Sequence, residues 1–413
     1  MSVFFIDFHS FTIMMTKKDK GGYFMNRTKI GIVFLLAWMC TFFSFVPASA
    51  LEQNERVNVF NDTWKLQTKT YKTIVVDPSK EKNPSWAIQL ALNEAKTSKQ
   101  PIKVFVKKGN YSLTKPLRIY SNTWLQLEKG TVMIRNHDQV MLLNGDYGAS
   151  YSGYNGNSNI IIDGGTWDGN GDSIKDDGTA FGISHAQNVL IQNVTVKDIY
   201  YSHGIDLAGS KNVVIRHSSF IGFFDDGTRG YAEAIQVDIT ASIHSFHEFG
   251  SYDLTPSQNI RIEDNYFGNS TTKGAKPWGV GIGSHSAVNG KKYDNIQILH
   301  NTFDHLSSVA IKAINWENVM IYQNNISAST YALFATNTEK DSVFQFSILE
   351  NKIDLQSSNK VALRFLGHPT AKISDIYIRG NAFSHVSPGQ KRAFWSDTNH
   401  IVFDEDTNTT NKK

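Results

Sequence analysis

Three carboxylic acids, one histidine and one lysine in the middle of the chain have side chains that could act on a sugar polymer. Glycoside hydrolysis needs two carboxyl groups, one protonated to assist the leaving group and one ionised to activate water or to act as nucleophile. Proton abstraction beside a uronate carboxylate needs a basic side chain and a cation, often calcium. The residues that we expect to be catalytic are Glu233, Asp206, Asp238, His285 and Lys312.

Most of these residues lie in short strand-like segments of alternating apolar pattern. Such segments read GIDLA from Gly204, AIQVD from Ala234 and AIKAI from Ala310. A residue between two inward apolar positions points outward. Where the outward residues are small they leave a groove open, and where they are aromatic they offer flat surfaces for sugar rings. The resulting outward column is Gly182, Asp206, Gln236, Gly281, Lys312, Phe334, Arg364 and Trp395.

A nine-residue phrase that occurs eight times predicts how these strands are arranged. It reads NIIIDGGTW from Asn159 and DIYIRGNAF from Asp375, and successive phrases start 23 to 47 residues apart, the longest spacing being about two periods. Turns this short cannot bury a face alone, whereas stacked turns can, so the pattern predicts an all-β, parallel β-helix. The fourth residue is always isoleucine, namely Ile162, Ile191, Ile215, Ile262, Ile298, Ile321, Ile348 and Ile378.

Two more positions of the phrase, and the segment before the repeats, fit the same stack. The seventh position predicts a ladder of hydrogen-bonded amides, and the ninth predicts an aromatic stack inside the coil. A helix is expected over residues 84–96, where it would cap the open end of the strand stack. The ladder residues are Asn265, Asn301, Asn324, Asn351 and Asn381, and the aromatic residues are Trp167, Phe220, Phe267, Phe303 and Phe383.

The order of the motifs resembles the polygalacturonase family, glycoside hydrolase family 28. This chain reads GIDLAGSKNVVI, then DDG followed by EAIQV, then WGVGIGSHS and then VAIKAINWENV. The family reads NTDGID, GDDCIAIK, GHGISIGS and RIK in the same order. The resemblance covers about residues 155–330, and the preceding part is similar to the pectate-lyase-like superfamily. It implies a right-handed, single-stranded parallel β-helix with a polysaccharide substrate.

The family's catalytic positions carry over only in part. Glu233 stands in the general-acid position and Lys312 keeps a positive charge, whereas His203 replaces an aspartate and Trp278 replaces a histidine. The DDG sequence falls seven residues before the paired aspartates of the family, in an expected loop above the groove. The residues that we expect to bind substrate are His203, Gln236, Trp278, Arg364, Trp395 and Asp226.

Three functions of different classes follow from these residues. The first is a glycoside hydrolase, in which the groove carboxylates act as acid and base. The second is a polysaccharide lyase, with a Lys, Arg or His base and calcium held by Asp206, Glu233 and Asp238. The third is a non-catalytic carbohydrate-binding surface protein, which the departures from the family pattern favour. We expect the hydrolase, with no metal site and no cofactor unless a lyase binds calcium.

Charge and cysteine content exclude several partners. Of the 413 residues, 41 are Lys or Arg and 38 are Asp or Glu, and the first 50 hold five of the former and two of the latter. The remainder therefore has 41−5 = 36 basic and 38−2 = 36 acidic residues, which gives no reason to expect nucleic acid or an anionic membrane as partner. The single Cys40 excludes disulfides, and we expect a monomer.

The N-terminus predicts export from a bacterial cell. Residues 25–50 have a basic start, an apolar run and a small-residue cleavage pattern, which is typical of a signal peptide. Lys20-Gly21-Gly22 can be encoded by a ribosome-binding sequence just before Met25. We therefore expect residues 1–24 to be a mis-annotated upstream extension, 51–406 to form the β-helix and 407–413 to be a polar tail. The mature protein would be extracellular and detached from the membrane.

Overall fold

The computed structural model describes residues 3–8, 11–16, 58–229, 232–356, 361–385 and 393–410. Met1–Asn58 and Val59–Lys413 are two separate compact units. The described part of the first is an antiparallel hairpin of β1 (Val3–Phe8) and β2 (Phe11–Thr16). The signal peptide expected over 25–50 lies outside the described residues. No helix within the described ranges is long and apolar enough to cross a membrane.

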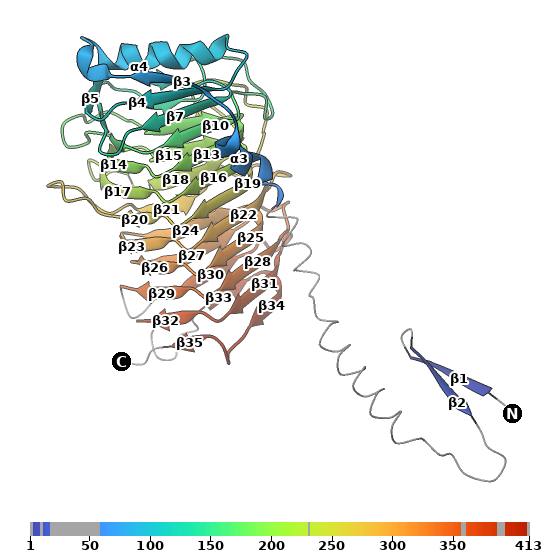
Figure 1. Cartoon of the computed structure of the whole chain (residues 1–413). Coiled ribbons are helices and arrows are strands. Elements are labelled where there is room, and N and C mark those ends of the chain that lie inside the picture. The colour runs from blue at the N-terminus through green and yellow to red at the C-terminus, as the bar shows by residue number, and fades with distance from the viewer. Residues whose placement is uncertain are drawn as a thin grey trace. The chain divides into compact units, whose positions relative to one another are not determined.

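The second unit is the expected right-handed parallel β-helix, built of three parallel sheets that run the length of the coil (Figure 1). Sheet 1 contains β3 (Lys72–Val76), β4 (Ile102–Val106), β7 (Thr123–Leu127), β10 (Ile160–Asp163), β13 (Gln187–Gln192), β16 (Lys211–Arg216), β19 (Gln258–Glu263), β22 (Tyr293–Leu299), β25 (Trp316–Tyr322), β28 (Val343–Leu349), β31 (Ile373–Arg379) and β34 (Thr398–Phe403). Sheet 2 contains β5 (Asn110–Leu113), β8 (Val132–Arg135), β11 (Thr166–Asp168), β14 (Thr195–Tyr200), β17 (Ser219–Phe224), β20 (Tyr266–Gly268), β23 (Thr302–Leu306), β26 (Asn325–Ala328), β29 (Lys352–Leu355), β32 (Ala382–Ser384) and β35 (Thr409–Thr410). Sheet 3 contains β6 (Leu117–Arg118), β9 (Leu142–Leu143), β12 (Phe181–Ser184), β15 (Ile205–Ala208), β18 (Glu233–Asp238), β21 (Val280–Gly283), β24 (Val309–Ile314), β27 (Tyr331–Thr336), β30 (Leu363–Leu366) and β33 (Ala393–Ser396).

The expected capping helix is α4 (Pro84–Asn93), which continues into the 3-10 turn η3 (Glu94–Lys96). Pro84 is its first residue, and the Asn83 side chain caps it by accepting a hydrogen bond from the Trp86 N–H at 3.1 Å. Ile88 and Leu92 are fully buried against the first turn. The helix therefore covers the open end of the coil, above β3 in Figure 1.

A second helical segment covers the outside of Sheet 1. It comprises α3 (Asn61–Lys65) and the 3-10 turn η1 (Leu66–Thr68); a third 3-10 turn, η2 (Pro78–Lys80), precedes α4. Phe60 and Leu66 pack on Ile161 and Leu190, which are buried although they point away from the coil interior. The β10 strand is therefore buried on both faces, and its apolar residues do not alternate with polar ones.

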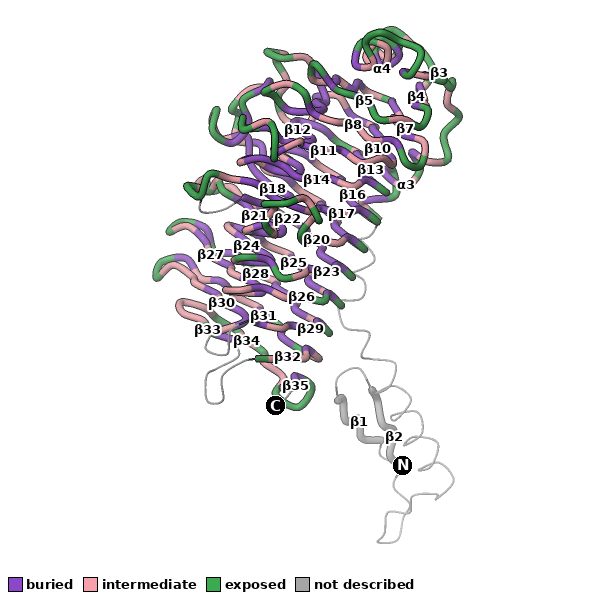
Figure 2. Tube along the Cα trace, turned by 90° about the vertical axis from the view of Figure 1, so that its left-hand side faces the viewer, coloured by how far each residue is buried: buried purple, intermediate pink, exposed green. Residues whose placement is uncertain are grey.

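The phrase isoleucines form the interior column that the sequence predicted. Each is paired with its counterpart on the next turn of Sheet 1, from Ile162 to Ile378, and each is buried. The ninth-position aromatics stack beside them, with ring centroids 5.1 Å apart for Phe220 and Phe267 and 4.7 Å apart for Phe267 and Phe303. Buried residues accordingly recur along the strands of the stacked turns in Figure 2.

The expected asparagine ladder is present and extends one turn further. The Asn265 Nδ2 donates to the Asn301 Oδ1 at 3.0 Å, and the same bond recurs from turn to turn as far as Asn408. β35 follows Asn408 directly and pairs with β32. Residues 407–410 thus belong to the last turn, so the expectation that a polar tail begins at residue 407 is wrong.

The 47-residue spacing corresponds to one turn and a long insertion, because β16 pairs directly with β19. The extra residues form the 239–257 loop, which connects β18 to β19 on the outside of Sheet 3. The expectation that this spacing holds two turns is therefore wrong. The insertion covers one part of the sheet that carries the candidate site.

The outward column of Sheet 3 differs from the expected one at two positions. Pairing gives Gly182, Asp206, Gln236, Gly283, Lys312, Phe334, Arg364 and Phe394. Gly283 replaces Gly281, a shift of two that preserves the side-chain direction. Phe394 replaces Trp395, and this shift of one residue reverses the side-chain direction. Trp395 therefore faces the interior and packs near Phe403.

Candidate functional site

The outer face of Sheet 3 is walled at its N-terminal part by two loops, residues 144–159 and 239–257. Phe246 and Phe249 of the second loop pack on Leu143 and Ala208 of the sheet. Backbone hydrogen bonds tie the loops together, among them Gly250 N–H to Ala149 O at 2.7 Å. The site described below lies beside this wall.

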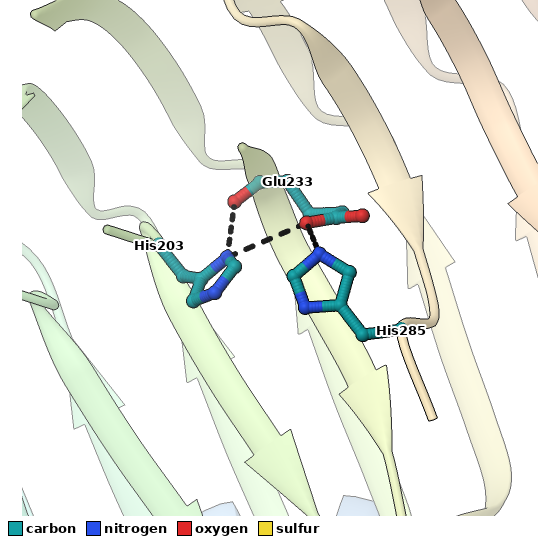
Figure 3. Close-up of side chains that lie close together, drawn as sticks. All are labelled: His203, Glu233 and His285. Carbon is teal, nitrogen blue, oxygen red and sulfur yellow. Dashed lines mark hydrogen bonds and ion pairs between the residues drawn. The ribbon is translucent and has the colours of Figure 1, made fainter. Parts of the chain in front are cut away.

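Glu233, His203 and His285 meet on three neighbouring turns of Sheet 3 (Figure 3). Glu233 is the first residue of β18, His203 precedes β15, and His285 follows β21. The Glu233 Oε2 lies 2.6 Å from the His285 Nε2 and 3.6 Å from the His203 Nδ1. The Lys312 Nζ lies 3.8 Å from the other carboxylate oxygen, Oε1. Gly283 makes room here, since a Cβ on it would come within 3.1 Å of Glu233 Cγ and Lys312 Cβ.

These basic neighbours keep Glu233 ionised although it is fully buried. Burial acts to raise the pKa of Glu233, but His285 above all, and then Lys312, outweigh it, so that the pKa is lowered to about 2. Burial lowers the pKa of His203 to about 3, so this imidazole is neutral. The Arg229 Nη2 donates a hydrogen bond to the His203 Nε2 at 3.3 Å. The ring proton of His203 is therefore on Nδ1, which donates to the Glu233 carbonyl oxygen, also at 3.3 Å.

Asp238 and Gln236 are also buried, on the outer side of β18. The Asp238 carboxylate accepts hydrogen bonds from the Tyr293 hydroxyl at 2.8 Å, the Ser286 N–H at 2.9 Å and the Gln236 Nε2 at 2.8 Å. Burial nevertheless raises the pKa of Asp238. Because its oxygens are occupied by these donors, Asp238 holds the chain after β21 in place and cannot reach a substrate.

Asp206 has a different environment. It is half-buried, and its Oδ1 is shielded from solvent without a hydrogen-bond partner. Burial, followed by the charges of Glu248, Asp238 and Glu233, raises its pKa well above the ordinary value. Glu248 comes from the 239–257 loop. Sequence reasoning missed it because nothing in the local sequence links that loop to Asp206.

The five residues expected to be catalytic therefore do not all line an open groove. Asp206, His285 and Lys312 are partly accessible, whereas Glu233 and Asp238 are completely covered by neighbouring side chains. That part of the expectation is wrong. The repeat pattern predicts the direction of each side chain but not the neighbours that cover it.

A group of aromatic and basic residues lies further along the same face. The Arg364 Nη1 donates to the Tyr331 hydroxyl at 2.6 Å, and the guanidinium lies 5.6–5.9 Å from the ring centroids of Tyr331, Phe334 and Phe394. Phe394 is 43% exposed. This Arg364 cluster, comprising Tyr331, Phe334, Arg364 and Phe394, contains one of the residues expected to bind substrate.

Three other residues expected to bind substrate are placed differently. Trp278 is fully buried in the interior, with its ring 5.1 Å from that of Phe223, so its expected contact with substrate is wrong. Trp395 faces the interior, and the same expectation for it is wrong. Asp226 lies in an exposed turn, where it accepts hydrogen bonds from Thr228. The same loop supplies Arg229 to His203, a contact that sequence reasoning missed.

Metal-ligating side chains converge at one place within the described ranges. There, His203, Glu233 and His285 bring their ligand atoms within 4.8 Å of one another. Asp206, Glu233 and Asp238, the expected calcium ligands, do not form such a group.

These features define a parallel β-helix protein with a partly walled outer face. No protein-family model matches the chain. The plasmin and fibronectin-binding protein A of Streptococcus pneumoniae (strain ATCC BAA-255 / R6) is 28% identical over 350 residues, which cover 73% of this chain and 48% of that protein. The chain therefore spans about half the length of this curated relative.

Solved structures support the fold. The structure of the Streptococcus pneumoniae surface protein and adhesin PfbA has a TM-score of 0.65 at 22% identity, covering 79% of this chain and 89% of that one. A tailspike protein of E. coli bacteriophage HK620, solved with a pentasaccharide, has a TM-score of 0.52 at 11% identity, covering 86% and 68%. Polygalacturonase structures have TM-scores of 0.45–0.47 at 12–13% identity.

The expectation of a glycoside hydrolase is wrong. The curated relative is a binding protein, and the similar PfbA structure is that of an adhesin. The site agrees, because Glu233, the expected general acid, is ionised and covered, and Asp238 is fully hydrogen-bonded. A general acid must hold a proton and reach the leaving group, whereas Glu233 is fully buried and its pKa is lowered.

Proposed function

We propose that this chain is an extracellular binding protein whose ligand is another protein, bound on the outer face of Sheet 3. This is closest to the third function considered above, with a protein in place of the carbohydrate. The similarity to a protein named for binding plasmin and fibronectin supports it. So does the signal peptide expected over residues 25–50, which would export the β-helix.

One observation carries the proposal. The accessible side chains of this face include the aromatic and basic residues of the Arg364 cluster, whereas the carboxylates of Glu233 and Asp238 are covered. Tyrosine and arginine are enriched among the residues that contribute most to binding at protein interfaces. In the Arg364 cluster the Tyr331 hydroxyl and three aromatic rings hold the guanidinium in position. An arginine that is already held in this way loses little conformational freedom when a carboxylate of a partner pairs with it.

The test is binding of the secreted chain to immobilised plasmin and fibronectin by surface plasmon resonance. We expect saturable binding to at least one of them. The double variant Arg364→Ala, Phe394→Ala should weaken it at least about tenfold by removing the centre of the cluster. Arg379→Ala is the matched control, because this arginine lies on Sheet 1 with a 70% exposed side chain. No binding to either protein, or equal losses in both variants, would contradict the proposal.

Enzyme assays complete the test. Incubation with a panel of plant and bacterial polysaccharides should release neither reducing ends nor unsaturated uronate products. Either product, formed by the purified chain and lost on Glu233→Gln or Lys312→Ala, would contradict a non-catalytic role. Binding to a polysaccharide without cleavage, in the absence of protein binding, would favour a carbohydrate ligand instead.

A further inference from the structure

Two imidazoles and a carboxylate of this face converge from separate turns, and no function proposed so far uses them. We propose that His203, Glu233 and His285 form a binding site for a zinc ion. The proposal is independent of the protein ligand suggested above. In Figure 3 the two rings and the carboxylate point toward one another from the ends of neighbouring strands.

The separations between the ligand atoms suit one metal ion. The Glu233 Oε2 is 2.6 Å from His285 Nε2 and 3.6 Å from His203 Nδ1, and all three ligand atoms lie within 4.8 Å of one another. Zinc bonds of about 2.0–2.2 Å in tetrahedral geometry place neighbouring ligand atoms roughly 3.3 Å apart. Small side-chain rotations would therefore bring all three atoms to a shared centre.

The hydrogen bonding of Glu233 supports the same conclusion. The side chain is fully buried, and apart from the close contact between Oε2 and the His285 Nε2 neither carboxylate oxygen has a hydrogen-bond partner in the described structure. Buried carboxylates normally accept hydrogen bonds or coordinate a metal. A metal between Oε2 and the two rings would satisfy this carboxylate.

Two cations near the site leave the metal position open. The Lys312 Nζ approaches Oε1, the oxygen that the two histidines do not share, at 3.8 Å. The Arg229 Nη2 lies 3.3 Å from His203 Nε2, the ring nitrogen that is not the proposed ligand. Zinc on Nδ1 would move the ring proton to Nε2, so Arg229 would have to turn away. Arg229 is half-buried, and its guanidinium lies 5.1 Å from the Tyr201 ring centroid, which is the contact that this movement would have to break.

The donor set favours zinc over calcium or magnesium. Two imidazole nitrogens and one carboxylate suit zinc, whereas calcium and magnesium prefer oxygen ligands alone. Three protein ligands leave a fourth position for water or for a group from a partner. His285, with a side chain 31% exposed, marks the side from which such a group can approach.

The experiment is metal titration of the whole secreted chain after removal of metals with a chelator. Isothermal titration calorimetry should show one zinc per chain and no response to calcium. Cobalt(II) should produce the visible absorption of a four-coordinate site, and zinc should raise the melting temperature. His285→Ala should weaken zinc binding by about a hundredfold or more, since loss of a ligand exceeds the loss of a supporting contact.

His300→Ala is the matched control. His300 and His217 also flank a carboxylate, that of Asp264, with Nδ1–oxygen distances of 3.8 and 4.0 Å, but at an exposed position. This variant should bind zinc as the unaltered chain does. His203→Ala provides a second ligand test, with circular dichroism to check folding; if it fails to fold, His285→Ala alone decides. Absence of stoichiometric zinc uptake, or undiminished affinity in His285→Ala, would overturn the proposal.

Discussion

The ladder asparagines show how a single residue type can hold neighbouring turns together. Asn324 Nδ2 donates to the Ile298 carbonyl oxygen at 2.9 Å and to the Asn351 Oδ1 at 3.0 Å, and its Oδ1 accepts from the Asn301 N–H at 2.8 Å. Every polar atom of this buried side chain is therefore satisfied across three turns. The sequence predicted this ladder because the repeat keeps asparagine at one position of the phrase.

Replacing Asn324 should be costly. Asn324→Ala leaves the Asn301 N–H and the Ile298 carbonyl oxygen buried without their partner, and each such group costs about 1–3 kcal/mol. We expect a matching drop in the free energy of unfolding, measured by urea denaturation. Asn325→Ala, next in sequence but exposed, should change it little. Equal stability of the two variants would show that the ladder does not stabilise the coil.

The site residues were predictable only in part, for reasons that are also visible at single positions. Alternation correctly predicted that Asp206, Gln236 and Lys312 share one face. It could not predict that Glu233 is covered, because His203, His285 and Lys312 reach it from three other turns. These contacts depend on side-chain length and direction across turns, which no local pattern contains.

At the level of elements, strand register decides which side chains reach the ligand face. Aligning Ala362, which precedes β30, with Ala393 of β33 predicts that Trp395 points outward, but the strands pair Arg364 with Phe394. A slip of one residue reverses every side chain in a strand. The eight-isoleucine column was predictable because eight phrases share it, whereas the last strand of Sheet 3 had no later repeat to fix its register.

The loops that wall the site are joined by Asp253, which makes their attachment dependent on pH. Its carboxylate accepts the Gly153 N–H at 2.6 Å and the hydroxyls of Thr240 and Thr255 at 2.8 and 2.7 Å. Burial acts to raise the pKa of Asp253, but these hydrogen bonds outweigh it and lower the pKa. A carboxyl group whose pKa is lower in the folded state than in the unfolded state stabilises the folded state. This stabilisation is complete at pH values above the unfolded-state pKa of about 3.9, and it is lost as the pH falls through the folded-state pKa.

We therefore expect the two loops to separate under acid conditions before the coil unfolds. Hydrogen exchange at the Gly153 and Thr255 amides, corrected for intrinsic rates, should accelerate as the pH falls below about 4. Asp253→Asn should accelerate this exchange at neutral pH and remove its acid dependence. Asp172→Asn, an exposed aspartate in another loop, should leave it unchanged. Exchange that is independent of pH in the unaltered chain would contradict the role of Asp253.

At the level of the whole second unit, stability is a sum over neighbouring turns, and the ends decide where unfolding begins. In a stacked repeat each turn contacts only its neighbours, so an uncovered terminal turn has lost half of its contacts. α4 supplies the missing contacts at the N-terminal end through Ile88 and Leu92. The sequence predicted this role from helical spacing alone, because the helix precedes the first turn of the coil.

Disrupting the cap should therefore unfold the coil from one end. Ile88→Asp would place a charge at a position that is fully buried against the first turn, which costs several kcal/mol or displaces the helix. Limited proteolysis followed by mass spectrometry should then show early cleavage between β3 and β9, while the turns from β22 onward remain protected. Leu90→Asp is the matched control, because Leu90 lies on the same helix and is 50% exposed. Each turn is stabilised by its neighbours, so unfolding of the first turn destabilises the next one and then the one after it. The sites of cleavage should therefore spread toward the C-terminus with time. Simultaneous cleavage along the whole coil in Ile88→Asp, or the same effect in Leu90→Asp, would contradict both the capping role of α4 and unfolding from the end.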